Sequence, residues 1–285
     1  MSALVLQSDF GKADGAVSAM YGVALGVDPK LRIFDLTHEI PPYDIWEGSY
    51  RLTQTINYWP SSTVFVSVVD PGVGTDRLSV VARTKTGHYI VTPDNGTLTH
   101  VAHFYGIEEL REIDETLNRL PFSGNSYTFH GRDVYAYTGA RLAAGVISFE
   151  QVGPLVDIDK LVKLPVVETS YADDGSLWGA IDALDVRYGS LWTNIPRLEF
   201  EKLGISYGER VLVTIRNNER MVYTNTMVLA HSFAEVNVGE TLVYPNSLDN
   251  MAVAINRGSF SQAYNVGYGT QWQISFDKDP LSRKA

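Results

Sequence analysis

The sequence contains no cysteine and comparatively few basic residues. Among its 285 residues, 23 are lysine or arginine and 33 are aspartate or glutamate, which gives a formal net charge of −10 with histidine neutral. The absence of cysteine excludes disulfide bonds, thiolate catalysis, iron–sulfur clusters and cysteine-ligated zinc. An acidic chain repels phosphate backbones, so we expect no nucleic-acid partner.

Long hydrophobic runs are also missing. No apolar stretch is long enough to cross a bilayer, and the run 1–6 is too short and too uncharged for a signal peptide. We therefore expect no membrane association and a cytoplasmic location. Hydrophobic residues still make up 45% of the chain, which is enough to bury one large core or two smaller ones.

The first half of the chain alternates short apolar strands with helices. Expected strands cover 4–7, 32–36, 63–69, 79–83 and 88–92, and expected helices cover 13–27, 45–58, 98–105 and 135–144. This alternation is typical of a mostly parallel sheet covered on both faces. We predict an N-terminal α/β domain over residues 1–165.

Beyond that point, strand-like segments follow one another without long helices between them. They cover 166–168, 177–184, 191–194, 210–216, 227–228, 241–244 and 272–276. Asp173-Asp174-Gly175 and Asn217-Asn218 are hairpin-turn signals. We predict a C-terminal antiparallel β-barrel-like domain over residues 166–285, which makes the whole chain an α/β protein of two domains.

Asp9 follows the first predicted strand and precedes a helix. Ligands of open α/β sheets bind at this edge, and a carboxylate there can accept two hydrogen bonds from a vicinal diol such as that of a ribose. The alternative is that Asp9 or Ser8 caps the helix. Asp14 is expected to make only local contacts.

The segment 69–77 places an acid, two glycines and a base directly after a buried strand. It lacks the Gly-Lys-Ser/Thr of a phosphate-binding loop, and Arg77 stands where a dinucleotide fingerprint has its third glycine. Asp70 and Arg77, brought together across this loop, can hold a water or an anion. The alternative is an ordinary turn with a surface ion pair.

His130 lies just before a predicted helix, and Asp133 is placed to cap that helix. Histidine is the usual proton carrier near neutral pH, although a lone histidine is more often structural. His100 and His103 lie one helical turn apart, but their neighbourhood offers no further metal ligands. We interpret that pair as packing or surface residues and expect no metal site.

Two segments of the second half are rich in rings, hydroxyls and amides: 185–194 and 244–258. Such groups suit a flat heterocycle. Ordinary strand-end chemistry is the alternative for each segment taken alone.

Several of these motifs occur together in one order. They are Ser8-Asp9-Phe10-Gly11, Asp70-Pro71-Gly72-Val73-Gly74-Thr75, Pro93-Asp94-Asn95-Gly96, Phe129-His130-Gly131-Arg132-Asp133 and Trp192-Thr193-Asn194-Ile195. This order resembles the S-adenosylmethionine (SAM) hydrolase family, also called SAM hydroxide adenosyltransferases, over residues 4–276. The resemblance implies an α/β domain followed by a β-barrel-like domain. It also implies a homotrimer with each site between the N-terminal domain of one subunit and the C-terminal domain of the next.

The resemblance implies that SAM is the substrate, that water cleaves it to adenosine and methionine, and that no cofactor or metal is used. Asp70, Arg77 and His130 match the family's residues that hold the nucleophilic water. In the related halogenating enzymes a tyrosine stands in place of Asp70, so the resemblance favours hydroxide over halide as the nucleophile.

The resemblance also implies a set of substrate-binding residues. Asp9 matches the carboxylate that grips the ribose hydroxyls, Tyr43 falls where the halogenases place a tryptophan against the ribose, and Phe129 matches a pocket ring. In the second half, Asp185 matches a carboxylate at the methionine amino group, Phe233 an adenine-stacking ring, and Ser247 and Ile255 positions near the methionine tail and the adenine edge. Ser190 also belongs to this set but replaces the usual Asn, and Ala252 stands where hydrolases commonly have Glu.

Three alternatives belong to other functional classes. A SAM- or adenosine-binding regulator would need the binding residues but not Asp70, Arg77 and His130. A halogenase-like adenosyl transferase would need a halide pocket, which a carboxylate at position 70 would repel. A purely structural trimer subunit would not explain so many polar, glycine-rich strand ends. The intact triad favours the hydrolase.

Overall fold

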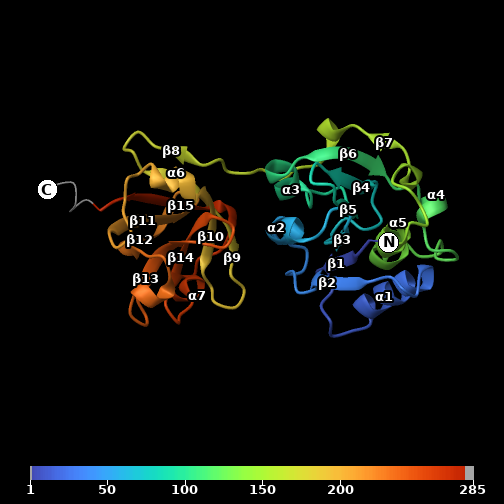
Figure 1. Ribbon diagram of the computed structural model, residues 1–285, viewed down its shortest axis with the longest axis horizontal. Coiled ribbons are helices and arrows are strands. Elements are labelled where there is room, and N and C mark those ends of the chain that lie inside the picture. The colour runs from blue at the N-terminus through green and yellow to red at the C-terminus, as the bar shows by residue number, and fades with distance from the viewer. Residues whose placement is uncertain (1, 280–285) are drawn as a thin grey trace. The chain divides into compact units, whose positions relative to one another are not determined.

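The computed structural model describes residues 2–279, and its backbone divides into two compact units, Met1–Leu164 and Pro165–Ala285 (Figure 1). No helix among the described residues has both the length and the apolar character to cross a membrane. Each unit has its own hydrophobic core, and each is described in turn.

The first unit is built on a seven-stranded sheet in the order β2-β1-β3-β5-β4-β6-β7. Its strands are β1 (Leu4–Ser8), β2 (Ile33–Thr37), β3 (Val64–Val68), β4 (Ser79–Thr84), β5 (Tyr89–Pro93), β6 (Ile107–Glu112) and β7 (Leu155–Val156). Strands β2, β1, β3 and β5 run parallel, whereas β4, β6 and β7 add an antiparallel half. The parallel half matters for function because its carboxyl ends share one edge.

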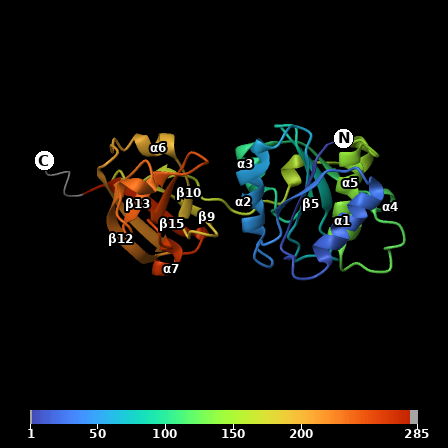
Figure 2. The same ribbon diagram turned by 60° about the horizontal axis from the view of Figure 1, so that its bottom comes forward.

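Helices cover both faces of this sheet (Figure 2). The α-helices are α1 (Ala16–Val27), α2 (Ile45–Thr55), α3 (Thr99–Phe104), α4 (Glu115–Asn118) and α5 (Tyr137–Ala144). Shorter turns are η1 (Ile56–Tyr58), the π-helical turn η2 (Gly131–Ala136), η3 (Glu150–Val152) and η4 (Ile158–Lys160). The α1 and α5 helices pack on one face, and α2 and α3 pack on the other.

The contact between α5 and the sheet is especially close at Gly139. A Cβ atom there would lie 2.4 Å from Val66 Cγ2, so only glycine lets the helix approach β3 to this distance. Because η2 leads directly into α5, the close packing of α5 on β3 also fixes the position of η2 at the edge of the sheet.

The second unit is a closed β-barrel. Its strands are β8 (Ser170–Tyr171), β9 (Leu177–Leu184), β10 (Leu191–Pro196), β11 (Arg210–Asn217), β12 (Arg220–Leu229), β13 (Thr241–Pro245), β14 (Asn250–Ile255) and β15 (Gly269–Lys278). They follow the order β10-β14-β13-β12-β11-β15-β9-β8, and pairing of β9 with β10 closes seven of them into a ring. All pairs are antiparallel except β12–β13. Short helices α6 (Arg197–Glu201), η5 (Phe233–Glu235) and α7 (Phe260–Tyr264) connect the strands.

The predicted fold class, an α/β domain with parallel strands followed by a β-barrel, is confirmed. Both hairpin signals lie at the expected turns, β8–β9 and β11–β12. The segment 166–168 is not a strand, and four strands were not predicted: β6, β14 and the two-residue strands β7 and β8. β6 reads Ile-Glu-Glu-Leu-Arg-Glu, a charged composition that favours helix. Backbone pairing with β4 and β7 and burial of Ile107 and Leu110 hold it in the sheet instead.

Candidate active site

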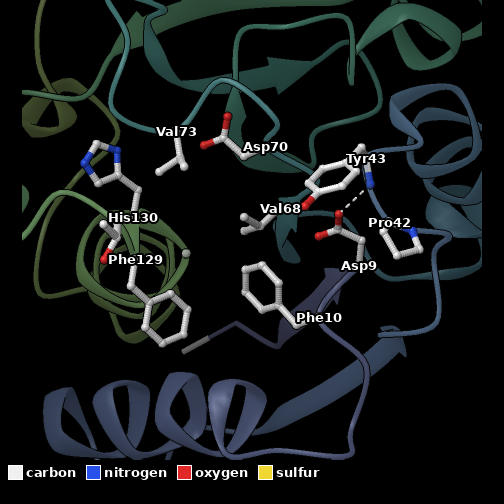
Figure 3. Close-up of a pocket in the computed structure, with 11 residues that line it drawn as sticks. Asp9, Phe10, Pro42, Tyr43, Val68, Asp70, Val73, Phe129 and His130 are labelled. Atoms are coloured by element: carbon white, nitrogen blue, oxygen red, sulfur yellow. Dashed lines mark hydrogen bonds between the residues drawn. The ribbon is translucent and has the colours of Figure 1, made fainter.

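A cavity of about 230 Å³ lies where the parallel strands end in the first unit (Figure 3). Its walls come from the loops after β1 and β3, the segment before α2, and the start of η2. The lining residues are Asp9, Phe10, Pro42, Tyr43, Val68, Asp70, Val73, Thr128, Phe129, His130 and Gly131. Pockets for drug-sized ligands measure roughly 300–1,000 Å³, so this one suits a fragment of about the size of a sugar.

Two acidic residues reach this cavity because β1 and β3 are neighbours in register. Ser8 pairs with Val68 at the ends of the two strands, and the following loops carry Asp9 and Asp70. Asn95, from the Pro-Asp-Asn-Gly motif, donates its side-chain N–H to the Val69 carbonyl at 2.8 Å. This bond anchors the start of the loop that carries Asp70.

Asp70 and Arg77 form a buried ion pair. Arg77 Nε donates to Asp70 Oδ1 at 2.6 Å, and a terminal guanidinium nitrogen of Arg77 donates to Asp70 Oδ2. The Asp70 side chain is only 6% exposed and the Arg77 side chain only 10%. Arg77 also donates to Ser79 Oγ at 3.2 Å and lies over the Tyr135 ring. The turn with a surface ion pair is therefore ruled out, since this pair is joined by two hydrogen bonds and is enclosed.

His130 completes a cluster with this pair. A terminal nitrogen of Arg77 lies 3.4 Å from His130 Nδ1, so Nδ1 is placed to accept and the ring proton belongs on Nε2. Burial lowers the pKa of His130, and the positive charges of Arg119 and Arg77 act in the same direction, whereas Glu115 and Asp70 oppose it. The imidazole is therefore neutral near pH 7 and presents a lone pair beside the guanidinium.

Arg77, by contrast, stays protonated. Burial alone would lower its pKa, but the hydrogen bonds and charge of Asp70 outweigh burial and raise it. Three polar groups thus converge on one side of the cavity: a carboxylate, a permanent cation and a neutral imidazole. This set can hold one water molecule by donating to its oxygen and accepting its protons.

The π-helical turn η2 sets the position of His130, which is its N-cap residue. Turns of this type occur frequently at functional sites. Asp133 was predicted to cap the helix, and this is wrong: it lies inside the turn, is buried, and pairs with Arg132. Gly131 follows His130 without a side chain, and a Cβ there would lie 2.8 Å from the Phe10 ring.

Asp9 is not a helix cap. The α1 helix begins at Ala16, whose N–H bonds to Asp14 at 2.9 Å, which confirms the local role of Asp14. Instead, Asp9 Oδ2 accepts the backbone N–H of Tyr43 at 2.8 Å, and its other oxygen points into the cavity (Figure 3). Tyr43 adopts a φ of 69°, a left-handed conformation that is uncommon and costly for a tyrosine.

Aromatic rings form the lower wall of the cavity in Figure 3. Phe10 and Phe129 meet edge to face with centroids 5.7 Å apart, and Arg132 lies over the Phe129 ring. The predicted residues Asp9, Tyr43, Asp70, Phe129 and His130 therefore line one cavity, and Arg77 joins them through Asp70.

The predicted residues of the second unit are arranged differently. Phe233 and Ile255 line a cavity of about 600 Å³, together with Arg187, Tyr188, Asn256, Arg257, Gly258 and Ser259. Asp185 accepts the backbone N–H groups of Arg187 and Tyr188 at 3.0 Å, so it shapes the turn that enters this cavity rather than lining it.

The other predicted residues of this unit lie around that turn or away from it. Ser190 is buried and bonds to the Tyr244 hydroxyl, and the Tyr244 ring packs on Phe233 at 5.0 Å. Ser247 is exposed after β13 and lines neither of these two cavities. Ala252 is fully buried on β14.

Sequence reasoning did not identify the apolar walls of the first cavity, Val68 and Val73, or the cations Arg187 and Arg257 of the second. The two valines carry no chemical signal of their own. Arg187 and Arg257 lie within segments singled out for their polar rings and amides, but nothing in the pattern distinguished them from exposed charges.

The two histidines of α3 are packing and surface residues, as expected. His100 is buried, accepts or donates to Ser49 Oγ at 2.9 Å and packs against Trp46, while His103 is exposed on Phe104. Within residues 2–279, no three His, Asp or Glu side chains are grouped so that they could hold a metal ion.

Comparison with known families and proteins gives a consistent result. Residues 4–153 match the SAM hydroxide adenosyltransferase N-terminal domain, and residues 179–273 match the C-terminal domain of the same family. A relative from Salinispora tropica named (R)-S-adenosyl-L-methionine hydrolase is 34% identical over 269 residues, covering 94% of this chain and 95% of the relative. A relative of the same name from Methanocaldococcus jannaschii is 36% identical over 219 residues, covering 75% and 73%.

Other relatives carry a different name. A fluorinase from Actinoplanes sp. is 30% identical over 289 residues, covering 93% of this chain and 95% of the relative. Among solved structures, an uncharacterized conserved protein from Thermotoga maritima superposes with a TM-score of 0.86 at 32% identity, covering 96% of this chain and all of that one. Both types of enzyme are therefore represented among the relatives, and the residues of the cavity must distinguish them.

Proposed function

Because this chain belongs to the SAM hydroxide adenosyltransferase family, we propose that it hydrolyses SAM to adenosine and L-methionine. The observation that carries the proposal is the buried Asp70–Arg77 pair, which faces neutral His130 on a cavity whose opposite wall is Asp9. Relatives named (R)-S-adenosyl-L-methionine hydrolase support the same reaction.

In the proposed reaction, water attacks the ribose 5′ carbon in line with the carbon–sulfur bond. The new C–O bond forms as the C–S bond breaks, and its electron pair remains on sulfur, which becomes the neutral thioether of methionine. The water loses one proton to Asp70, whose carboxylate oxygens each keep a lone pair beside the one that accepts from Arg77, and from Asp70 the proton passes to solvent. Because a sulfonium is already a good leaving group, the protein's main task is to orient the water.

Orientation is a sufficient contribution for this chemistry. Holding two reactants in a near-attack geometry is worth up to roughly 7–11 kcal/mol in the best cases. Arg77 stabilises the hydroxide character that develops on the water, and it does so from a fixed position, since Asp70 holds its guanidinium at two points.

The remaining predicted residues bind the substrate in this proposal. Asp9 accepts the ribose hydroxyls, and the rings of Tyr43 and Phe129 flank the sugar. In the second unit, Phe233 stacks on adenine and Ile255 contacts its edge. Asp185 and Ser190 hold the turn that leads into the second cavity, and contact of these residues and of Ser247 with the methionine end stays a prediction.

A halide-using reaction and a regulatory role are disfavoured by the same cluster. A buried carboxylate at position 70 repels a halide ion at the place where it would attack. A protein that only binds SAM needs neither the two hydrogen bonds between Asp70 and Arg77 nor the imidazole beside them. Burying an ion pair costs free energy of desolvation, and a catalytic role accounts for that cost whereas a regulatory role does not.

The test is incubation of the purified protein with SAM in a buffer free of halide and added metal, with adenosine and methionine followed by chromatography. We expect equal amounts of both products from the wild type and a loss of at least about 100-fold for Asp70→Asn, since such electrostatic contacts contribute factors of this order. Glu109→Gln is the matched control, because it makes the same carboxylate-to-amide change at an acid that pairs with Arg83 on the same sheet away from the cavity. Full turnover by Asp70→Asn would contradict the proposed role.

The absence of a cofactor and the assembly into a homotrimer stay predictions. If the protein uses no cofactor or metal, dialysis against a chelator leaves its activity unchanged. Light scattering of the purified protein gives three times the chain mass of 31.6 kDa if the second holds.

A further inference from the structure

Behind the loop that carries Asp9 lies a chain of hydrogen bonds from Ser8 through His38 to Asp35. Ser8 Oγ lies 2.7 Å from His38 Nδ1, and His38 Nε2 lies 3.1 Å from Asp35 Oδ1. Lys12 and Tyr21 both bond to the same Asp35 carboxylate. A serine, a histidine and an aspartate in this order suggest a nucleophilic triad, but Ser8 and His38 are both completely buried. The serine hydroxyl therefore cannot attack a substrate, and the network needs another explanation.

The direction of each hydrogen bond follows from the groups involved. The Asp35 carboxylate only accepts, so His38 Nε2 carries the ring proton and Nδ1 accepts from the Ser8 hydroxyl. Burial lowers the pKa of His38 although Asp35 opposes this, so the ring is neutral. The Ser8 oxygen in turn accepts the backbone N–H of Phe10 at 3.3 Å. The network thus runs from a surface ion pair to the backbone of the loop.

His38 holds this loop from two sides. Its side chain bonds to Ser8, the residue before Asp9, and its backbone carbonyl accepts the N–H of Gly11 at 2.7 Å. Asp9 and Phe10 lie between these two attachment points. Gly11 adopts a φ of 67°, which allows the chain to turn back toward that carbonyl at no steric cost.

We propose that His38 is a positioning residue for Asp9, fixing the loop 8–11 so that the Asp9 carboxylate faces the ribose diol of the ligand. Asp35 keeps the imidazole in the tautomer and orientation that this task requires, in the way that an outer partner orients a ligand-holding histidine. The inference rests on the proposed function for the identity of the ligand, but it makes a separate statement about which residues determine ribose binding.

Substitutions at His38 can separate its two bonds. In His38→Gln the amide reaches the position of Nε2 and keeps the bond to Asp35, but loses the acceptor for Ser8. In His38→Asn the amide reaches the position of Nδ1 and keeps the acceptor for Ser8. Positioning of Asp9 depends on Ser8, so we expect His38→Asn to bind ribose better than His38→Gln. Ser8→Ala removes the same contact from the other side and serves if either variant fails to fold.

His88 offers a matched control. It is equally buried, its Nδ1 lies 2.9 Å from Thr86 Oγ1, and its Nε2 lies 2.9 Å from the Trp59 carbonyl. It precedes β5 at the opposite end of the strand from the cavity. His88→Gln therefore loses a comparable hydrogen bond in the same unit without touching the loop that carries Asp9.

The experiment is calorimetric titration of the full-length protein with adenosine and with 2′,3′-dideoxyadenosine, which lacks the diol. We expect His38→Gln and Ser8→Ala to weaken adenosine binding about tenfold, the effect of one impaired charge-assisted hydrogen bond, and to leave dideoxyadenosine binding unchanged. His88→Gln changes neither. In an Asp9→Ala background, His38→Gln has no further effect, because its target is gone.

Equal weakening for both nucleosides, or the same loss in His88→Gln, would overturn the positioning role, since either result indicates general destabilisation. So would additive losses in the Asp9→Ala background, or failure of the wild type to bind adenosine. The proposed function is judged separately by release of adenosine from SAM. A wild type that shows the expected binding pattern but does not cleave SAM would refute the hydrolase and leave the role of His38 intact.

Discussion

Replacing Arg77 by methionine tests whether the Asp70–Arg77 pair is enclosed as the structure indicates. The substitution keeps much of the apolar stem but removes both hydrogen bonds to a carboxylate that is only 6% exposed. Breaking a buried pair by deleting one partner costs about 3–5 kcal/mol, because the remaining charge stays uncompensated. We expect a loss of this size in the free energy of unfolding of the first unit.

A second substitution separates stability from chemistry. Adding Asp70→Asn removes the uncompensated charge, so the double variant regains about 2 kcal/mol and retains a deficit of about 1–3 kcal/mol for unmade hydrogen bonds. Its activity does not return, because neither the carboxylate nor the guanidinium is present to hold the water. Between the single and the double variant, stability therefore recovers in part while activity stays lost.

Hydrogen exchange read on peptides from β3 and β5 is the suitable assay, because the chain has two units and a single melting curve would mix them. SAM turnover is measured on the same samples. If Arg77→Met costs less than about 1 kcal/mol, the pair behaves like a solvent-screened surface bridge, and the reasoning from burial is refuted. Recovery of activity in the double variant would equally refute the proposed role of the pair.

Three further predictions follow from individual residues. Gly131→Ala brings a Cβ within 2.8 Å of the Phe10 ring and displaces that ring in the cavity. We expect kcat/KM to fall by about tenfold or more, while hydrogen exchange of the core is little changed. Unaltered kinetics would show that the Phe10 ring can move aside without effect on the reaction. Because burial lowers the pKa of His130, the ring stays neutral at pH values below 6.5, the ordinary pKa of histidine. We therefore expect kcat/KM to decline only below pH 6.5. An identical decline in His130→Gln would show that another group causes it. Burial lowers the pKa of His100 to about 4, so between pH 6.5 and 4 the unfolded chain binds a proton at this ring and the folded chain does not. The free energy of unfolding therefore falls by up to about 3 kcal/mol as the pH is lowered over that range. His100→Asn abolishes this part of the pH dependence of stability.

The local parts of the site are visible in the sequence. Asp70 and Arg77 are seven residues apart, and a tight loop after a buried strand brings them together whatever the rest of the fold does. Asp9 was recognisable for a similar reason, because the edge of a parallel sheet is where ligands bind. The choice between a helix cap and a site residue was not decidable, since it depended on the Tyr43 N–H, which comes from another loop.

The long-range parts were accessible only through resemblance or not at all. His130 lies sixty positions beyond Asp70 in the chain, and only the approach of α5 to β3 brings it to Arg77. The network through His38 escaped notice because its members lie on two strands and a loop, and each is ordinary by itself. The charged strand β6 was missed because its backbone pairing with β4 and β7, rather than its own composition, determines its structure.

The most direct test of the account is cleavage of SAM in water enriched in ¹⁸O, with the products analysed by mass spectrometry. Attack on the ribose 5′ carbon predicts one ¹⁸O atom in the 5′-hydroxyl of adenosine and none in methionine. Unlabelled adenosine would contradict water as the nucleophile. Labelled homoserine with 5′-methylthioadenosine would show that water attacks the methionine side of the sulfonium instead.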